Sequence, residues 1–273
     1  MKIEQFAAMN MVYQRYTFSY FLDSIERMGV KNFELWAGAP HLNNYISSLS
    51  DAAAVRREVE RRNMRIVCFT PEQVMYPHNI AASNRELRKF SLDYFFKYID
   101  MAAEAGADKM LCCSGWGDYD QPVEEAWKRS VDGLYQMADR AQKAGITLAF
   151  EILQTMECNL VYNLPTTKRM MDEVVHPNFK LCVDTVPMRV FHNTLKDFFE
   201  EFKNRICHLH LTDGNPSRHV PLGLGTTPIA EHLEFMDLYG YDGYVTLEIG
   251  DSSWWPRPEE ATRTAFDTLK KYL

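Results

Sequence analysis

Four short stretches decide the fold of this chain: Thr147-Leu-Ala-Phe-Glu151, Lys180-Leu-Cys-Val-Asp184, Ile206-Cys-His-Leu-His210 and Tyr244-Val-Thr-Leu-Glu248. Each is a brief apolar run, typical of a buried strand, and each ends in a side chain that can bind a metal. Side chains alternate between the two faces of a strand, so each acid or imidazole falls at the last pleat before a turn-rich segment. If the strands are parallel neighbours in a closed barrel, these four side chains meet at one rim.

The same spacing continues along the whole chain. Strand-like runs are expected at Ile3–Met9, Phe33–Ala37, Arg65–Thr70, Met110–Ser114, Thr147–Ile152, Leu181–Asp184, Ile206–Thr212 and Tyr244–Ile249. Amphipathic helical patterns separate them, including Ser50–Arg62 with Ser50-Asp51 as its expected cap, Asn84–Ala105 and Val123–Ala144. Eight successive strand–helix units predict a (β/α)8 TIM barrel, and without a linker or composition shift residues 1–273 are predicted to form one domain. Active sites of this architecture lie at the carboxyl ends of the strands.

Composition and charge exclude several classes of protein. The chain has 273 residues, 46% apolar and 25% charged, with a net charge of −7, which argues against a nucleic-acid partner. No apolar run approaches the roughly 18 residues that span a bilayer. The segment Met1–Met9 is too short and too acidic for a signal peptide. Six cysteines without a CxxC pair predict reduced, buried thiols and a cytoplasmic location.

The four strand-end side chains predict a metal site. Three carboxylates and one imidazole would repel one another strongly at close range unless a divalent cation held them. Glu151, Asp184, His210 and Glu248 form an oxygen-rich donor set. Such a set suits Mn²⁺ or Mg²⁺ and accepts Co²⁺; Zn²⁺ is possible, although closed structural zinc sites prefer thiolate and imidazole. One such residue alone would be an ordinary polar strand end, but four at matching pleats favour a metal.

These motifs resemble those of a known family. Phe150-Glu151, Cys182-Val-Asp184-Thr185, His208-Leu-His210-Leu-Thr-Asp213 and Leu247-Glu248-Ile249 are similar to the ligand motifs of the sugar phosphate isomerase/epimerase barrels of the xylose isomerase-like superfamily, and within them to the ketose 3-epimerases. Further segments resemble a subgroup, the fructoselysine 3-epimerases: Phe33–His41, Thr70-Pro71-Glu72 with Tyr76-Pro77, Glu157-Cys-Asn159 and Arg218–Gly225. The resemblance covers essentially the whole chain.

Two positions depart from that pattern. Many relatives carry a histidine three residues after the strand-six aspartate, where this chain has Pro187. A glutamate often found between the late glycines is replaced by Leu224. Because of Pro187, the substrate contacts of the hexulose 3-epimerases are less readily assigned to this chain. The same change argues against the DNA-repair endonuclease branch of the fold, which needs extra histidines for a multi-metal site.

The resemblance implies an isomerase. A divalent metal would chelate a sugar, and Glu151 and Glu248 would transfer a proton at C3 of a ketose or ketosamine of the fructoselysine/psicoselysine type through a cis-enediolate. The alternatives are an aldose–ketose isomerase, an enzyme of the same superfamily that processes 3-keto-glycosides, and a non-catalytic barrel subunit. An intact ligand quartet argues against the last of these.

Further residues are expected around the substrate. Glu157 is predicted to bind substrate hydroxyls, and Arg218 and His219, in the loop after strand seven, to bind substrate oxygens; the alternative is a solvated loop position for each. Trp36 and His41 are predicted to line the pocket. The alternative is a tryptophan packed in the core and a histidine that caps a helix. His208 lies one pleat deeper than His210 and is expected to be a hydrogen-bonded core histidine.

The rim loops suggest a subunit contact and a substrate type. Trp116, Trp254 and Trp255 are expected to be exposed aromatics of a lid, of the substrate wall or of a homodimer or homotetramer interface. Asp251 and the two neighbouring tryptophans occupy the loop after strand eight, where barrels of this type commonly bind phosphate. The expected small-molecule substrate is therefore an unphosphorylated sugar.

Overall fold

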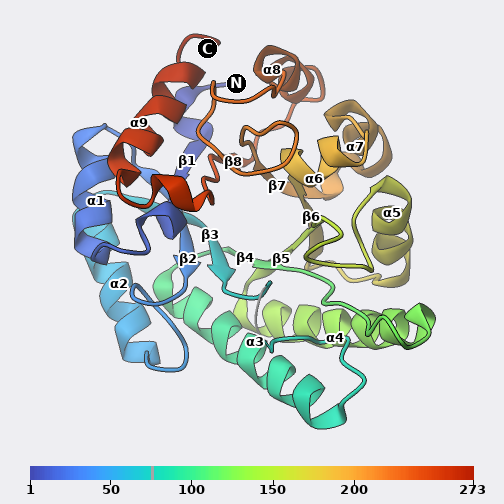
Figure 1. The fold of residues 1–273 in the computed structure, drawn as a ribbon. Helices are drawn as coiled ribbons and strands as arrows, with labels where there is room; N and C mark the ends of the chain where they lie inside the picture. Colours follow the sequence, from blue (N-terminus) through green and yellow to red (C-terminus); the bar gives the residue numbers. More distant parts are fainter. Residues whose placement is uncertain (75–76) are drawn as a thin grey trace.

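The computed structural model describes residues 1–74 and 77–273, so Tyr76 of the motif quoted above lies outside the described residues. Eight parallel strands close into a barrel in the order β1 to β8, and the helices surround it (Figure 1). The strands are β1 (Phe6–Met9), β2 (Asn32–Ala37), β3 (Arg65–Pro71), β4 (Lys109–Cys112), β5 (Thr147–Glu151), β6 (Phe179–Asp184), β7 (Ile206–His210) and β8 (Tyr244–Thr246). The predicted (β/α)8 barrel is confirmed.

The helices follow the strands in chain order. They are α1 (Phe18–Arg27), α2 (Leu49–Arg61), α3 (Arg85–Ala105), α4 (Val123–Ala144), α5 (Leu164–Glu173), α6 (Thr185–Val190), α7 (Leu195–Phe202), α8 (Ile229–Leu238) and α9 (Pro258–Leu269). The expected bounds of α4 are confirmed, and the helix stops at Gly145, whose φ of 74° lies in the left-handed region that favours glycine. The expected cap of α2 was wrong: Ser48, not Ser50, accepts from the backbone N–H of Asp51, which closes a reciprocal capping box.

Strand ends differ most from the prediction. The first strand begins at Phe6 because Ile3–Gln5 forms a 3₁₀ turn, in which the Gln5 side chain accepts from the backbone N–H of Lys2 at 2.9 Å. Strand β8 ends formally at Thr246, yet the Leu247 N–H still donates to the carbonyl of Ala7 at 2.8 Å. The extended course therefore continues to Glu248, which remains at the rim.

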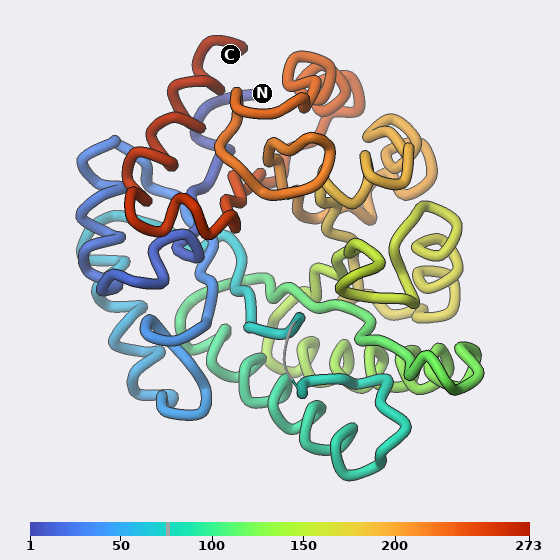
Figure 2. The backbone as a smooth tube through the Cα atoms, viewed as in Figure 1, coloured from blue at the N-terminus to red at the C-terminus, as the bar shows by residue number. Residues whose placement is uncertain are grey.

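The core lies between the barrel and its helices. Apolar faces of the helices bury against the outer surface of the strands, and strand residues such as Phe69 and Phe150 are fully buried. A smaller apolar cluster of Cys68, Leu111, Ala149 and Cys182 forms separately from that core. All six cysteines are free thiols. The two termini lie close together, with α9 near β1 (Figure 2). Among the described helices, none combines the length and apolarity that crossing a membrane would take.

Candidate metal centre and active site

Four donor side chains converge at the carboxyl ends of β5 to β8. His210 Nδ1 lies 2.7 Å from Glu151 Oε1 and 2.9 Å from Glu248 Oε2. One ligand atom from each of Glu151, Asp184, His210 and Glu248 falls within 4.8 Å of all the others. Three of these side chains are buried, and Glu248 is the most exposed of the four, with 14% of its side chain accessible. The structure thus brings together the quartet that the strand ends predicted.

The contacts inside the quartet fit a bound cation. Although His210 Nδ1 and Glu248 Oε2 are only 2.9 Å apart, both are buried and neither has a well-aligned hydrogen-bond partner among the described residues. Two buried polar atoms that face each other without a hydrogen bond are costly unless a third species satisfies them. A cation bound between the two atoms would satisfy both. Together with two further carboxylates, this arrangement fits a hard or borderline divalent ion.

Asp184 is held from two sides. One oxygen, Oδ1, accepts from the backbone N–H of Val186 at 2.8 Å and so caps α6. The other, Oδ2, lies 2.9 Å from Nε2 of His219, which also stands 3.6 Å from Glu248 Oε2. His219 therefore contacts two members of the quartet.

The loop between β7 and α8 brings His219 to this position. Asp213 organises the loop by accepting from the backbone N–H groups of Gly214, Gly223 and Thr227 at 2.8–2.9 Å. A Cβ at Gly225 would lie 2.4 Å from Asp213 Oδ1, so only glycine fits beside that carboxylate. The carbonyl of His219 then accepts from the N–H groups of Gly250 and Asp251, which joins this loop to the loop after β8.

Glu34, in the middle of β2, lies directly behind His210 and was not predicted as a site residue. Its carboxylate is fully buried and accepts from His208 at 2.8 Å and from His210 Nε2 at 3.0 Å. His208 is therefore a buried, hydrogen-bonded histidine of the barrel interior, in the arrangement expected for it. The available signal for Glu34 was a carboxylate inside an otherwise apolar strand, Phe33-Glu34-Leu35-Trp36, because a charged group is rarely buried there without partners.

Burial and neighbouring charges oppose each other throughout the cluster. Burial raises the pKa of Glu151 despite the opposing effect of His210. Burial acts in the same direction on Glu248, but His210 and His219 outweigh it and lower the pKa of Glu248. Burial disfavours a charged His210 ring, yet Cys182 and the surrounding carboxylates raise its pKa well above the usual value. Such opposing shifts of two nearby carboxyl groups are typical of sites that transfer protons.

Three members of the quartet, Glu151, Asp184 and Glu248, line a cavity of about 600 Å³ at the rim. Among the predicted substrate-binding residues, its described lining includes Trp36, Glu157, Arg218 and His219. The remaining walls combine apolar side chains with further acids, and they are formed by Met9, Met11, Gln14, Thr70, Pro71, Glu72, Gln73, Val74, Leu111, Leu153, Gly250 and Asp251. Its size is that of a pocket for a small molecule.

His41 and Trp116 are not among the described residues that line this cavity. The His41 ring is held elsewhere: Nδ1 lies 2.6 Å from Asn10 Nδ2, and Nε2 lies 2.9 Å from the carbonyl of Tyr16. Its position matches the alternative of a capping histidine. Trp116 is half-buried, and Asn79 bonds both its backbone N–H and its carbonyl.

The expectation that Trp254 and Trp255 are exposed was wrong. Both are half-buried and pack against the hydrophobic core. Each also lies under a guanidinium group, with Arg257 5.0 Å from the Trp254 ring and Arg15 5.0 Å from the Trp255 ring. These contacts remove most of the aromatic surface that would be free for a lid or a second subunit.

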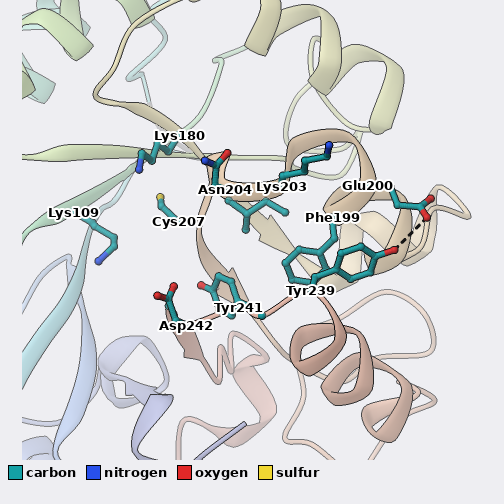
Figure 3. A pocket seen from close by; sticks show the side chains of 13 residues that line it. Lys109, Lys180, Phe199, Glu200, Lys203, Asn204, Cys207, Tyr239, Tyr241 and Asp242 are labelled. Carbon is teal, nitrogen blue, oxygen red and sulfur yellow. Dashed lines mark hydrogen bonds between the residues drawn. The ribbon is translucent and has the colours of Figure 1, made fainter.

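A larger cavity, about 690 Å³, lies at the other end of the barrel, where the strands begin (Figure 3). Lys109, Lys180 and Cys207 line one part of it, and the stacked rings of Phe199 and Tyr239 line another. Its described lining contains none of the predicted ligand or substrate residues. The smaller cavity is therefore the candidate active site, since it contains the convergent donors.

Comparison with known proteins agrees with this fold. The model of the xylose isomerase-like TIM barrel family matches residues 22–272, and the chain belongs to that family. Fructoselysine 3-epimerase of Shigella flexneri is 26% identical over 239 residues, covering 87% of each chain. D-psicose 3-epimerase of Agrobacterium fabrum is 24% identical over 238 residues, covering 85% of this chain and 78% of its own. These relatives support an enzyme of the isomerase class.

Solved structures agree on the fold. D-psicose 3-epimerase of Clostridium cellulolyticum H10 superposes with a TM-score of 0.81 at 18% identity, covering 98% of this chain and 97% of its own. A 3-keto-D-glucoside 4-epimerase of E. coli gives a TM-score of 0.79 at 16% identity, covering 98% of each chain. At these identities the likeness establishes the barrel architecture alone, because one such fold supports many chemistries.

Proposed function

We propose that this protein is a divalent-metal-dependent epimerase that acts at C3 of a ketose or ketosamine. The observation that carries the proposal is the pair of glutamates, Glu151 at the end of β5 and Glu248 just after β8, which share His210 Nδ1 as a neighbour at 2.7 and 2.9 Å. They approach that point from strands three places apart in the barrel. Two epimerases among the relatives, acting on fructoselysine and on D-psicose, support the same reaction class.

Epimerisation requires two proton-transfer groups. One carboxylate removes the proton from C3, and the electron pair of the C–H bond moves toward the carbonyl oxygen at C2. The second carboxylic acid then delivers a proton to the opposite face of C3, because a single base would restore the original configuration. Glu151 and Glu248 would fill these roles, and they exchange roles in the reverse direction. A divalent ion held by the quartet would supply Lewis acidity for the negative charge that develops on the substrate oxygens.

Mn²⁺ is the proposed ion. Three carboxylates and one imidazole form a donor set that suits Mn²⁺ and also accepts Co²⁺, Mg²⁺ or Zn²⁺. No cysteine belongs to the proposed set; the nearest, Cys182, has a thiol pKa raised well above the usual value by burial. A thiolate ligand, which would favour zinc, is therefore not part of the proposal.

We further propose an unphosphorylated substrate. Arg218 is the cation that reaches the cavity rim from the β7 loop, and its Nε donates to Asp251 Oδ2 at 2.6 Å. Asp251 thus neutralises the guanidinium that a phosphate would need. The cavity lining is otherwise strongly acidic, since Glu72 and Glu157 add to the three carboxylates of the quartet. A phosphate dianion would be repelled there.

The same acidic lining favours a substrate that carries an amine. A ketosamine has a cationic secondary amine next to its carbonyl group. Glu72 lines the cavity and has no cationic partner among the described residues, and partial burial raises its pKa. Pairing with the substrate ammonium would relieve the cost of keeping this carboxylate charged. Glu157, which accepts from the backbone N–H of Gln154 at 3.1 Å, would be positioned for the sugar hydroxyls.

We also propose a cytoplasmic homo-oligomer built on a twofold dimer. Closed twofold symmetry is the commonest arrangement of soluble oligomers. Because Trp254 and Trp255 are packed inward, other apolar side chains are better contact candidates, such as Tyr45 with 58% and Ile46 with 78% of their surface exposed.

One experiment separates the proposed reaction from its alternatives. The protein with saturating Mn²⁺ is incubated in D₂O with a free ketose, its terminal phosphate and an amine-linked analogue, and quenched samples are analysed by NMR after metal removal. The epimerase reading predicts deuterium at C3 and inversion there, with the ketosamine preferred. Formation of an aldose would favour the isomerase, and turnover of a 3-keto-glycoside alone would favour that activity. No exchange on any substrate would favour a non-catalytic barrel. A phosphorylated substrate preferred by more than about tenfold would overturn the unphosphorylated reading.

A further inference from the structure

We infer that Glu34 is a positioning residue that fixes the tautomer of His210 and thereby sets the affinity of the metal centre. This inference rests on the proposed function, in which His210 binds a divalent ion. It concerns a residue outside the quartet, on β2, which is three places from β7 in the closed strand order.

The two nitrogens of His210 face different surroundings. Nδ1 faces the rim, where Glu151 and Glu248 lie within 2.9 Å. Nε2 faces the barrel interior, where Glu34 Oε2 lies at 3.0 Å and Oε1 at 3.2 Å. A neutral imidazole carries one N–H, and a carboxylate can only accept a hydrogen bond. When a cation displaces the proton of Nδ1, the ring is neutral, and Glu34 keeps the remaining proton on Nε2 and the lone pair of Nδ1 on the cation.

The Glu34 carboxylate is itself fixed. Thr70 Oγ1 donates to Oε1, and His208 Nε2 lies 2.8 Å from Oε2. All of these groups are buried, with Glu34, His208 and His210 showing no exposed surface. With donors from three side chains, the carboxylate cannot rotate away from the imidazole without losing a hydrogen bond inside the core, where an unmade bond is costly.

This geometry has a chemical consequence. A carboxylate that accepts from the outer N–H of a metal-binding imidazole orients the ring and makes its other nitrogen a better donor. Glu34 is buried deeply enough that water does not screen it. The barrel interior therefore supplies both the direction and the basicity of the one nitrogen ligand in the site.

The test compares Glu34→Gln with the wild-type chain by calorimetric titration of the metal-free proteins with Mn²⁺. The amide keeps the shape of the side chain but loses the charge and can present an N–H₂ group to His210. Removing such an outer partner typically weakens metal binding about 10- to 100-fold, and we expect a loss in that range. Cys68→Ala is the matched control, because Cys68 is fully buried on the neighbouring strand β3 and pairs with Glu34 in the strand register.

The outcomes are distinct. If the wild-type chain binds Mn²⁺ and Glu34→Gln binds it with the same affinity, the role of Glu34 is overturned and the metal site stands. The same holds if Cys68→Ala loses as much Mn²⁺ affinity as Glu34→Gln. Failure of the wild-type chain to bind Mn²⁺ would overturn the proposed function itself.

A second measurement needs no variant, in case Glu34→Gln does not fold. In histidine-labelled wild-type protein loaded with Zn²⁺, ¹⁵N NMR should show His210 protonated at Nε2 and metal-bound at Nδ1. A His210 protonated at Nδ1 would overturn the inference.

Discussion

Glu151→Gln and Glu248→Gln should each abolish epimerisation while leaving the fold unchanged. Both substitutions keep the size of a side chain that lies within 2.9 Å of His210 Nδ1, and both remove the carboxylate that is proposed to exchange a proton with the substrate. General acid–base catalysis contributes about 100- to 10,000-fold to a rate. The expected loss in kcat is therefore at least about 100-fold, or roughly 2.7 kcal/mol of activation free energy.

The two variants need not be equivalent in hydrogen exchange. With one carboxylate left, a proton can be removed from C3 and returned to the same face, so one variant should still incorporate deuterium without inverting the carbon. The assay follows both products by NMR in D₂O at saturating Mn²⁺, with metal binding measured separately because each glutamate is also a proposed ligand. Glu60→Gln, an exposed glutamate on α2, is the control. A variant that keeps turnover within about threefold of wild type would remove that glutamate from the acid–base pair.

Three further predictions address the metal, the stability and the assembly. Removal of metal by a chelator should abolish activity, and free Mn²⁺ at about a thousand times its Kd should add about 4 kcal/mol to the free energy of unfolding; full activity in metal-free protein would contradict this. His232, buried on α8, has a pKa lowered to about 4 by burial and by Arg189. Its ring is neutral in the folded state, so its contribution to the free energy of unfolding is present above pH 6.5 and is lost as the pH falls toward 4. The free energy of unfolding should be lower by about 2 kcal/mol at pH 5. Denaturant titrations at several pH values should show that the free energy of unfolding depends less on pH in His232→Leu than in the wild type. An equal pH dependence would refute the role of His232. Sedimentation should show a homo-oligomer. If only a monomer is found at micromolar concentration, the proposed assembly is excluded.

The barrel was predictable because its signal repeats. Strand-like apolar runs alternate with amphipathic helices that have clear stops, such as Gly145 after α4. The ends of the strands were less predictable. An apolar run such as Met110–Ser114 does not reveal where pairing stops, and β4 ends at Cys112 because parallel pairing depends on the neighbouring strand. The expected start of the first strand is instead a local 3₁₀ turn, which the Gln5 side chain and the Asn32 side chain help to stabilise.

The convergence of the four strand-end side chains was predictable for a different reason. A barrel places every strand end at the same rim, so position along a strand translates directly into position in space. No such rule holds for loop residues. His41 and Trp116 follow strands, as Arg218 does, yet neither lines the cavity among the described residues. The His41 ring bonds the carbonyl of Tyr16, and the Trp116 backbone is held by the Asn79 side chain. Loop side chains depend on hydrogen bonds formed with partners far along the chain, which a linear pattern does not contain.

The contact between His219 and Asp184 illustrates this limit most clearly. By resemblance, many relatives carry a histidine three residues after the strand-six aspartate, and Pro187 in that position suggested that an imidazole was missing. In the structure Pro187 is buried in α6, while His219, 35 residues away in sequence from Asp184, brings Nε2 to 2.9 Å from its carboxylate. An imidazole beside this aspartate therefore comes from the β7 loop, which Asp213 folds back toward the rim. What a site requires is a group at a point in space, and a substitution at one position is informative only after the loops that could supply that group have been placed.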